Sequence, residues 1–231
     1  MSRSVVQAGT VRCEQCQLPP RWCVCGAIAP VISDLKVGVL MHHREQWRPS
    51  STGRLIERVF QGARKHVVRR DAPPERSVVV EPGRDLWILH PRGEAIVREQ
   101  QAPVAVERVQ VLLLDGSWSE ATNLLRCVRP WGKCVSVGLA GNSRYWLRQQ
   151  MAPGQLSTVE ALIGLLEALD LSEEVARMRL HFELHVYASL RARGNTELAA
   201  EYLRESPIRE AFPEVLARLR ERRPNAESLE S

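Results

Sequence analysis

Four cysteines crowd together near the start of the chain, in the pattern Cys13-x2-Cys16-x6-Cys23-x-Cys25. Four thiolates satisfy a tetrahedral zinc ion, and a segment this short cannot build a core of its own, so bound metal would fold it. The second pair has one intervening residue instead of two, and a redox pair or incidental cysteines are the alternatives. We expect zinc in a structural role, because a closed four-sulfur site leaves no open position for a substrate.

Residues 111–120, VLLLDGSWSE, form a second candidate site. An apolar run ends in Asp-Gly, and Glu120 follows Ser117 at the spacing of a capping box that opens a helix. Ligands of parallel sheets bind beyond the carboxyl ends of strands, where glycine permits close approach and helix N–H groups point outward. An ordinary strand-turn-helix corner is the alternative. The residues expected to face a cofactor are Asp115, Gly116, Ser117 and Trp118.

Two further segments, 143–148 (SRYWLR) and 156–161 (LSTVEA), carry aromatic, arginine and serine residues. Ser157 and Glu160 again have the spacing of a capping box. The helix that they open would bury an apolar face made of Val159, Leu162, Ile163, Leu166 and Leu169. Together with residues 111–120, these segments would form the walls of a cleft. Each segment alone is also compatible with a purely structural role.

A hydroxyl-rich stretch, 49–55 (PSSTGRL), follows a His-His-Arg run. A glycine-containing helix start beside several arginines would suit an anion, and the same residues also serve as an ordinary helix cap. His181 and His185 would lie on one helical face and could ligate a metal. Packed or surface histidines are the more common case, and the glutamate of the metalloprotease pattern is missing.

An alternation of strands and helices must position these segments. Strands are predicted at 35–41, 77–81, 85–90, 109–114 and 133–138, and helices at 53–66, 118–127 and 159–169. Such alternation is typical of an α/β fold with a mostly parallel sheet and helices on both faces. The C-terminal third differs, because its periodic segments predict consecutive helices at 173–193, 197–204 and 208–222.

Length and composition limit the organisation of the chain. Its 231 residues fit one sizeable α/β core plus a small appendage, and 44% hydrophobic with 26% charged residues is typical of a globular protein. We expect a tail and zinc-binding cysteine module over 1–29, a catalytic domain with C-terminal helices over 30–223, and a frayed tail over 224–231.

The net charge is +5, and nearly all basic residues are arginines, since the lysines are Lys36, Lys65 and Lys133. Arginine's planar fork suits phosphate and stacked bases, so a nucleic-acid partner is one explanation and a GC-rich genome is the other. No apolar run approaches the ~20 residues that span a bilayer, and the first residues lack the apolar stretch of a secretory signal. We therefore expect a cytoplasmic protein without a membrane partner, in a compartment that keeps the crowded cysteines reduced.

Taken in order, these segments resemble the DTW-domain family, which is named for an Asp, Thr and Trp signature. The cysteine cluster, Ser-Thr-Gly-Arg-Leu, the Asp-x-Ser-Trp corner, Ser-x-Tyr-x-Leu-Arg and Leu-Ser-Thr-x-Glu-Ala span about residues 13–168. Each motif is weak alone, and their joint order is specific. The signature threonine is Ser117 here, which keeps the hydroxyl and its capping chemistry. Residues 42–45 (HHRE) look like a variant of the family's His-Pro stretch.

The resemblance implies a SPOUT-like fold with a knotted cofactor site, and transfer of a 3-amino-3-carboxypropyl group from S-adenosylmethionine to N3 of a tRNA uridine. The expected catalytic residues are Asp115 and Trp118. Asp115 is either the base for the N3 proton or only a ligand of the cofactor's amino group or sugar. Other expected cofactor contacts are Gly116, Ser117, Tyr145, Leu147, Leu156, Ser157, Thr158, Glu160 and Ala161. Expected contacts to the RNA backbone or the cofactor carboxylate are Arg44, Arg54, Arg144 and Arg148.

Two other functions stay open at the level of sequence. A SPOUT-like RNA methyltransferase would share the cofactor and the architecture, and a zinc-ribbon RNA-binding protein would need no catalysis. The three differ in the product made from S-adenosylmethionine, which is methylthioadenosine, S-adenosylhomocysteine or nothing. The resemblance implies a target uridine in the variable loop of tRNA for bacterial relatives and in the D-loop for eukaryotic ones. The residues of this sequence do not indicate which of the two applies.

Overall fold

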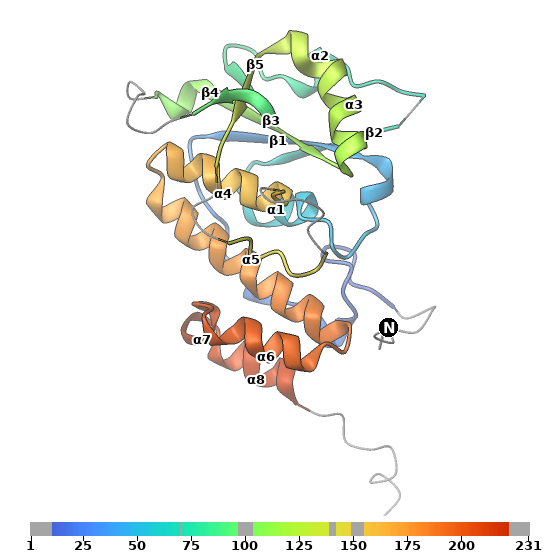
Figure 1. Cartoon of the computed structure of the whole chain (residues 1–231), viewed down its shortest axis with the longest axis vertical. Coiled ribbons are helices and arrows are strands. Elements are labelled where there is room, and N and C mark those ends of the chain that lie inside the picture. The colour runs from blue at the N-terminus through green and yellow to red at the C-terminus, as the bar shows by residue number, and fades with distance from the viewer. Residues whose placement is uncertain (1–10, 70, 97–103, 139–141, 149–154, 222–231) are drawn as a thin grey trace, which may run out of the picture.

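The computed structural model describes residues 11–69, 71–96, 104–138, 142–148 and 155–221. The first ten residues and the tail that was expected to fray from residue 224 lie outside this part of the chain. The described residues form a sheet layered between helices, with a stack of further helices at one end (Figure 1).

The sheet has five strands in the order β2-β1-β4-β3-β5, and every pairing is parallel. The strands are β1 (Lys36–His42), β2 (Arg64–Val68), β3 (Asp85–Ala95), β4 (Val109–Asp115) and β5 (Lys133–Ser136). The predicted parallel α/β sheet is therefore confirmed. Because all strands run the same way, their carboxyl ends meet at one edge, and the two central strands β1 and β4 place Met41 beside Asp115 there.

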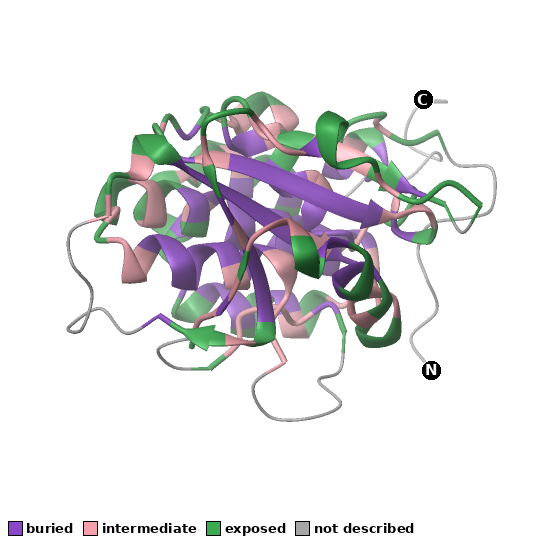
Figure 2. Ribbon diagram, turned by 90° about the horizontal axis from the view of Figure 1, so that it is seen from above, coloured by how far each residue is buried: buried purple, intermediate pink, exposed green. Residues whose placement is uncertain are grey.

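Helices cover both faces of the sheet (Figure 1). One face is covered by α1 (Gly53–Val59) and α4 (Thr158–Ala168), on which α5 (Ser172–Ala192) packs, and the other by α2 (Arg76–Val79) and α3 (Trp118–Val128). Side chains alternate accordingly, since Val39 and Met41 join the first layer and Leu40 joins the second. Figure 2 shows the strands buried between these layers.

The predicted helical C-terminal part is also present. It continues from α5 into α6 (Thr196–Arg204), α7 (Ile208–Ala211) and α8 (Pro213–Arg220), which stack on the end of α5 (Figure 1). One helix was expected over 208–222, but Phe212 leaves the helical region at φ −135° and Pro213 starts a new helix as its first residue. Short 3-10 helices lie at Pro20–Trp22, Cys25–Ala27, His43–Glu45, Val106–Arg108 and Arg129–Trp131.

The strand predicted at 77–81 is wrong, because this segment forms helix α2 and lies outside the sheet. Gln110 supplies the reason. Its Nε2 donates to the Val79 carbonyl and its Oε1 accepts from the Glu81 N–H, both at 2.8 Å. These side-chain bonds satisfy backbone groups that a neighbouring strand would otherwise use.

The helix predicted at 53–66 is too long, and strand β2 within it was missed. Val31 ends the helix, because its N–H donates to Val59 O at 2.7 Å and its carbonyl accepts from Gln61 N at 2.8 Å. Gly62 then turns the chain at φ +77° into β2. This strand is a basic edge strand with a single buried residue, so it lacks the apolar alternation that marks a strand in sequence.

The cysteine segment has no separate core. Cys16, Leu18, Trp22 and Val24 are buried in the same apolar cluster as α1, α4 and α5. Packing against the main body thus supports a segment that would otherwise depend on metal alone. Of the helices in the described part of the chain, none combines the length and the apolar character needed to cross a membrane.

Candidate active site

Asp115 ends β4 at the sheet edge where the candidate segments meet. Its side chain is 5% exposed, and its two oxygens accept hydrogen bonds from Thr158 Oγ1 at 2.5 Å and Ser51 Oγ at 3.1 Å. Gly53 allows this close approach, because a Cβ there would lie 2.6 Å from Asp115 Oδ2. Burial raises the pKa of the Asp115 carboxyl, and the hydroxyl donors lower it to a smaller extent.

Both predicted capping boxes are confirmed, and they fix the two corners beside Asp115. The Glu120 carboxylate accepts from the Ser117 N–H at 2.8 Å, and the Glu160 carboxylate accepts from the Ser157 N–H at 2.9 Å. Each serine hydroxyl accepts in return from the glutamate N–H. The N-terminal turns of α3 and α4 are therefore held rigidly at the carboxyl edge of the sheet.

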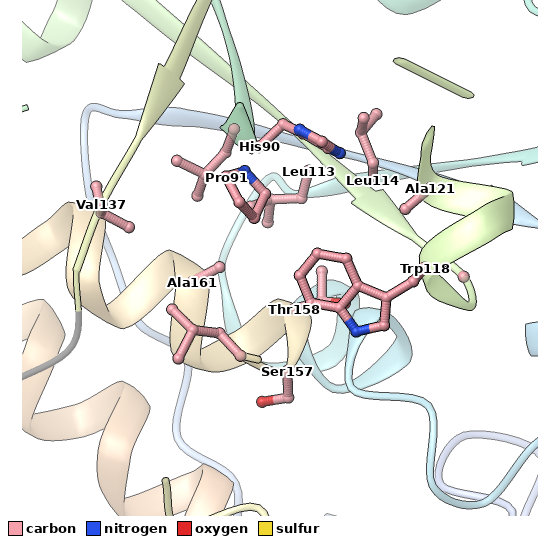
Figure 3. A pocket seen from close by; sticks show the side chains of 13 residues that line it. His90, Pro91, Leu113, Leu114, Trp118, Ala121, Val137, Ser157, Thr158 and Ala161 are labelled. Atoms are coloured by element: carbon pink, nitrogen blue, oxygen red, sulfur yellow. The ribbon is translucent and has the colours of Figure 1, made fainter. Parts of the chain in front are cut away.

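The first compartment of the site is lined mainly by residues of apolar type, called here its apolar half, and has a cavity volume of about 140 Å³. It lies between the middle of β3, where its pairing with β4 stops, the end of β4 and the first turn of α4 (Figure 3). Trp118, which is 44% exposed, extends from the start of α3 toward Thr158. The remaining lining residues are Leu89, His90, Pro91, Leu113, Leu114, Gly116, Ala121, Val137, Leu156, Ser157 and Ala161.

A second, polar compartment of about 240 Å³ adjoins the first. Its charged and hydroxyl-bearing lining residues are Glu45, Ser50, Ser51, Thr52, Asp115, Ser117, Tyr145 and Arg148, together with Gln155. The two compartments share Gly116, Trp118, Leu156, Ser157 and Thr158. Both corners therefore line one continuous hollow, and Trp118 and Thr158 stand where its apolar and polar halves join.

Glu45 is a site residue that the sequence reasoning missed. It is 2% exposed, and its carboxylate pairs with Arg148 Nη2 at 2.9 Å and with Arg48. Arg148 also donates to Ser50 Oγ at 3.3 Å, and the Tyr145 hydroxyl donates to Ser50 O at 2.5 Å. The only signal available in sequence was a lone acid within a basic stretch.

Two of the four nominated arginines are engaged inside the protein. Arg144 donates to Glu183 Oε2 at 3.2 Å and to Tyr202 O at 2.8 Å, and its guanidinium lies 4.0 Å from the centre of the Tyr202 ring. Arg54 donates to the carbonyls of residues in the cysteine segment, including Gln15 O at 3.0 Å. Arg148 lines the polar compartment, and Arg44 is exposed beside α3.

Leu147 and Glu160 line neither compartment. Leu147 is buried in the apolar core, at 6% exposure. Glu160 accepts hydrogen bonds from Ser143 Oγ at 2.7 Å and from Arg144 N at 2.8 Å, in addition to capping α4. Its carboxylate therefore ties the loop that carries Tyr145 to the start of α4.

The four clustered cysteines lie close enough together to hold one metal ion. The Sγ atoms of Cys13, Cys16, Cys23 and Cys25 all lie within 4.8 Å of one another, and the Cys13–Cys25 and Cys16–Cys23 pairs are 3.8 Å apart. Zinc–sulfur bonds of about 2.3 Å in a tetrahedron put the sulfurs about 3.75 Å apart, so the cluster fits the size of zinc. Arg58 Nη1 contacts Cys25 Sγ at 3.3 Å and would offset the charge of four thiolates.

His181 and His185 are buried and pack inside the protein. Among the described residues, the four cysteines are the only group of three or more His, Cys, Asp or Glu side chains close enough to hold a metal ion. His185 is 2% exposed, and its Nε2 lies 3.1 Å from Pro49 O. Burial lowers the pKa of His185 to about 3, so the imidazole is neutral. It buttresses the loop that carries Ser50 and Ser51 into the polar compartment.

The family model described as the DTW domain matches residues 10–191, which include the cysteine cluster, both capped corners and most of α5. Helices α6, α7 and α8 lie beyond the matched region. No solved structure matches this chain.

Proposed function

Because this chain belongs to the DTW-domain family, a family of tRNA-modifying enzymes, we propose that it transfers a 3-amino-3-carboxypropyl group from S-adenosylmethionine to N3 of a tRNA uridine. The observation that carries the proposal is the two-part hollow, whose apolar and polar halves meet at Trp118 and Thr158. Family membership implies an RNA substrate. The transferred group is the one that the family resemblance implies, and the lining of the hollow supports it.

The two compartments fit the two ends of S-adenosylmethionine. The apolar half, with Leu89 and Leu113 in its lining, suits the adenosine. The polar half suits the amino-acid arm, because Arg148 offers a fork for its carboxylate while Asp115 and Glu45 offer oxygens for its ammonium group. The sulfonium would then lie near the residues that both halves share. This division favours transfer of the longer arm over the methyl group, because the polar half fixes that arm.

The proposed transfer is a nucleophilic substitution at a carbon of S-adenosylmethionine. The uridine N3–H loses its proton to a base, N3 forms a bond to the arm carbon next to sulfur, and that carbon–sulfur bond breaks. The sulfur keeps the electron pair, so the positively charged sulfonium leaves as neutral 5'-methylthioadenosine. Holding the reacting atoms at about 3–3.5 Å is the main contribution expected of the protein.

We propose Asp115 as the base. A carboxyl whose pKa is raised by burial holds a proton better than an exposed one, and Asp115 lines the polar half beside the junction. The competing role is that Asp115 only binds the ammonium group or sugar. Trp118 is proposed to wall off the methyl group, since it extends across the junction (Figure 3).

The remaining parts of the proposal concern the fold, the metal and the location. We infer a SPOUT-like sheet with a knot from the family resemblance alone, and the five-stranded parallel sheet between helices is compatible with it. We infer zinc at the four cysteines from their sulfur spacing. A tRNA substrate and four unpaired thiols together favour a cytoplasmic protein.

Product analysis tests the function directly. Incubation with S-adenosylmethionine and unmodified tRNA should release methylthioadenosine and add the aminocarboxypropyl mass to one uridine. Release of S-adenosylhomocysteine would instead make the protein a methyltransferase. A protein that binds tRNA and consumes no S-adenosylmethionine would be a binding protein, and the proposal would fail.

Asp115→Asn separates the two roles of Asp115. A base predicts retained S-adenosylmethionine affinity with a single-turnover rate lowered about 100-fold or more, which is the usual contribution of general base catalysis. Lost affinity with a normal rate at saturation would leave Asp115 as a ligand only. Asp85→Asn is a matched control, because Asp85 is an exposed acid at the opposite edge of the sheet.

A further inference from the structure

A second hollow lies among the C-terminal helices, away from the sheet. It has a cavity volume of about 280 Å³ and lies where α6, α7 and α8 stack on the end of α5 (Figure 1). Its lining is dominated by arginines, and the full set is Tyr187, Arg191, Ala200, Leu203, Arg204, Arg209 and Arg220. Four guanidinium groups thus gather at one concavity.

These arginines have no acidic partner within the described residues. No ion pair or side-chain hydrogen bond joins Arg204, Arg209 or Arg220 to the described part of the chain, although Glu201, Glu205, Glu210 and Glu214 lie on or next to the same helices. By contrast, Arg177 and Arg179 on α5 both pair with glutamates. Arg191 packs over Trp22, and its buried Nε has no partner either.

Helix capping accounts for only part of this arrangement. Arg204 and Arg220 are the last residues of α6 and α8, where a cation interacts favourably with the helix dipole. Arg209 is the second residue of α7, where the dipole disfavours a cation. Helix termini therefore do not explain why all four arginines face one hollow.

A phosphate group matches the hollow in charge, size and hydrogen bonding. Guanidinium forks bind phosphate oxygens in pairs, and unpaired clustered arginines have a strong requirement for an anion. Tyr187 adds a phenol to the lining. The hollow is open at the protein surface through exposed Arg204, Arg209 and Arg220, so a phosphate within a long chain could enter it.

The end of α5 links this hollow to the candidate active site. Arg193 lies two residues after Arg191, and its Nη1 donates to Leu147 O at 2.6 Å in the loop that carries Tyr145 and Arg148. The end of α5 therefore contributes Arg191 to the arginine hollow and, through Arg193, contacts the loop that lines the polar compartment. Arg54 and Arg144 are engaged internally and offer less to an RNA chain.

We propose that the hollow formed by Arg191, Arg204, Arg209 and Arg220 binds a backbone phosphate of the tRNA. The inference rests on the proposed function only in taking tRNA as the substrate. Arg204, Arg209 and Arg220 lie beyond the region that the family model matches. The hollow would therefore be an RNA contact that the matched domain does not contain.

The test compares two triple variants of equal charge change in the full-length protein. Arg204→Gln/Arg209→Gln/Arg220→Gln removes the exposed side of the hollow. Arg64→Gln/Arg76→Gln/Arg108→Gln is the control, since these three arginines are exposed and lie outside both sites. We expect the first variant to bind tRNA at least about tenfold more weakly near 0.1 M salt, with a salt dependence shallower by about 1 or more in log-log slope. Equal losses in both variants would overturn the proposal.

Further arms separate the remaining explanations. The matching Arg→Lys triple variant should keep most of the salt dependence, which also guards against misfolding of the Gln variant. Titration of inorganic phosphate, followed by ³¹P NMR, tests whether the hollow binds a small ligand instead. If the Gln variant loses phosphate binding but binds tRNA as tightly as the control variant, the tRNA assignment is overturned. Failure of the aminocarboxypropyl reaction would show in product analysis while leaving tRNA affinity measurable, so the two proposals fail independently.

Discussion

Gly53→Ala should damage the site more than the fold, because the nearest atoms to the added Cβ belong to the Asp115 carboxylate and to Val39. The added Cβ would lie 2.6 Å from Asp115 Oδ2 and 3.0 Å from Val39 Cγ1. Ordinary contact begins near 3.4 Å, so the carboxylate must move by about 0.8 Å. That shift stretches the bond from Ser51, which is now 3.1 Å, beyond hydrogen-bond range.

Two effects of Gly53→Ala on the free energy of unfolding have opposite signs, whereas its effect on the transfer rate has one. Alanine gains up to about 1 kcal/mol in helix propensity, while loss of a hydrogen bond to a buried carboxylate costs about 1–3 kcal/mol. The free energy of unfolding should therefore fall by about 0–3 kcal/mol. A misplacement approaching 1 Å in a positioned group costs about 100-fold in rate.

The assay is single-turnover release of methylthioadenosine, measured beside chemical denaturation. Gly26→Ala is a matched control, because a Cβ there meets nothing within 4 Å. A Gly53→Ala protein with the normal rate would show that the Asp115 position does not matter to transfer. A protein that loses stability and rate together, and recovers its rate at low temperature, would point to simple unfolding.

Two other predictions concern His185 and the cysteine cluster. The pKa of about 3 for His185 lies below its ordinary 6.5, so the unfolded chain binds the proton first, and the free energy of unfolding should fall by about 1.4 kcal/mol per unit as pH drops from 6.5 toward 3. Urea titrations should show a shallower decline for His185→Gln, and parallel curves would refute the assignment. Cys16→Ser should lower the zinc content measured by mass spectrometry and reduce Tm by at least about 2–4 °C, the shift expected for each 1 kcal/mol lost in a domain of this size. Cys127→Ser should change neither, because Cys127 is exposed and lies outside the cluster.

The parts of the fold that sequence predicted well are governed by local rules. Strand β4 is an uninterrupted apolar run, and the boxes at Ser117 and Ser157 need only residues three positions apart. Strand β2 was missed because edge strands need no apolar face. Helix α2 was mistaken for a strand because the deciding bonds come from Gln110, 31 residues away from Val79.

The site divides in the same way. Asp115, Trp118 and Thr158 follow from motifs at the ends of their elements, and all three line the hollow. Glu45 was invisible because its role depends on Arg148, 103 residues later in the chain. The internal use of Arg144 likewise depends on Tyr202, in a helix whose packing no local pattern specifies.

Helix α1 contacts both the cysteine cluster and the candidate active site. Its first turn lies against Asp115 through Gly53, while Arg54 binds carbonyls of the cysteine segment and Arg58 contacts Cys25. A helix of seven residues is about 10 Å long, too short to bend much between two such anchors. A change in the cluster that moves Arg54 or Arg58 must therefore also move Gly53, and with it the carboxylate that Gly53 contacts. The cysteine cluster and the candidate active site are thus mechanically joined, although no cysteine lines the hollow.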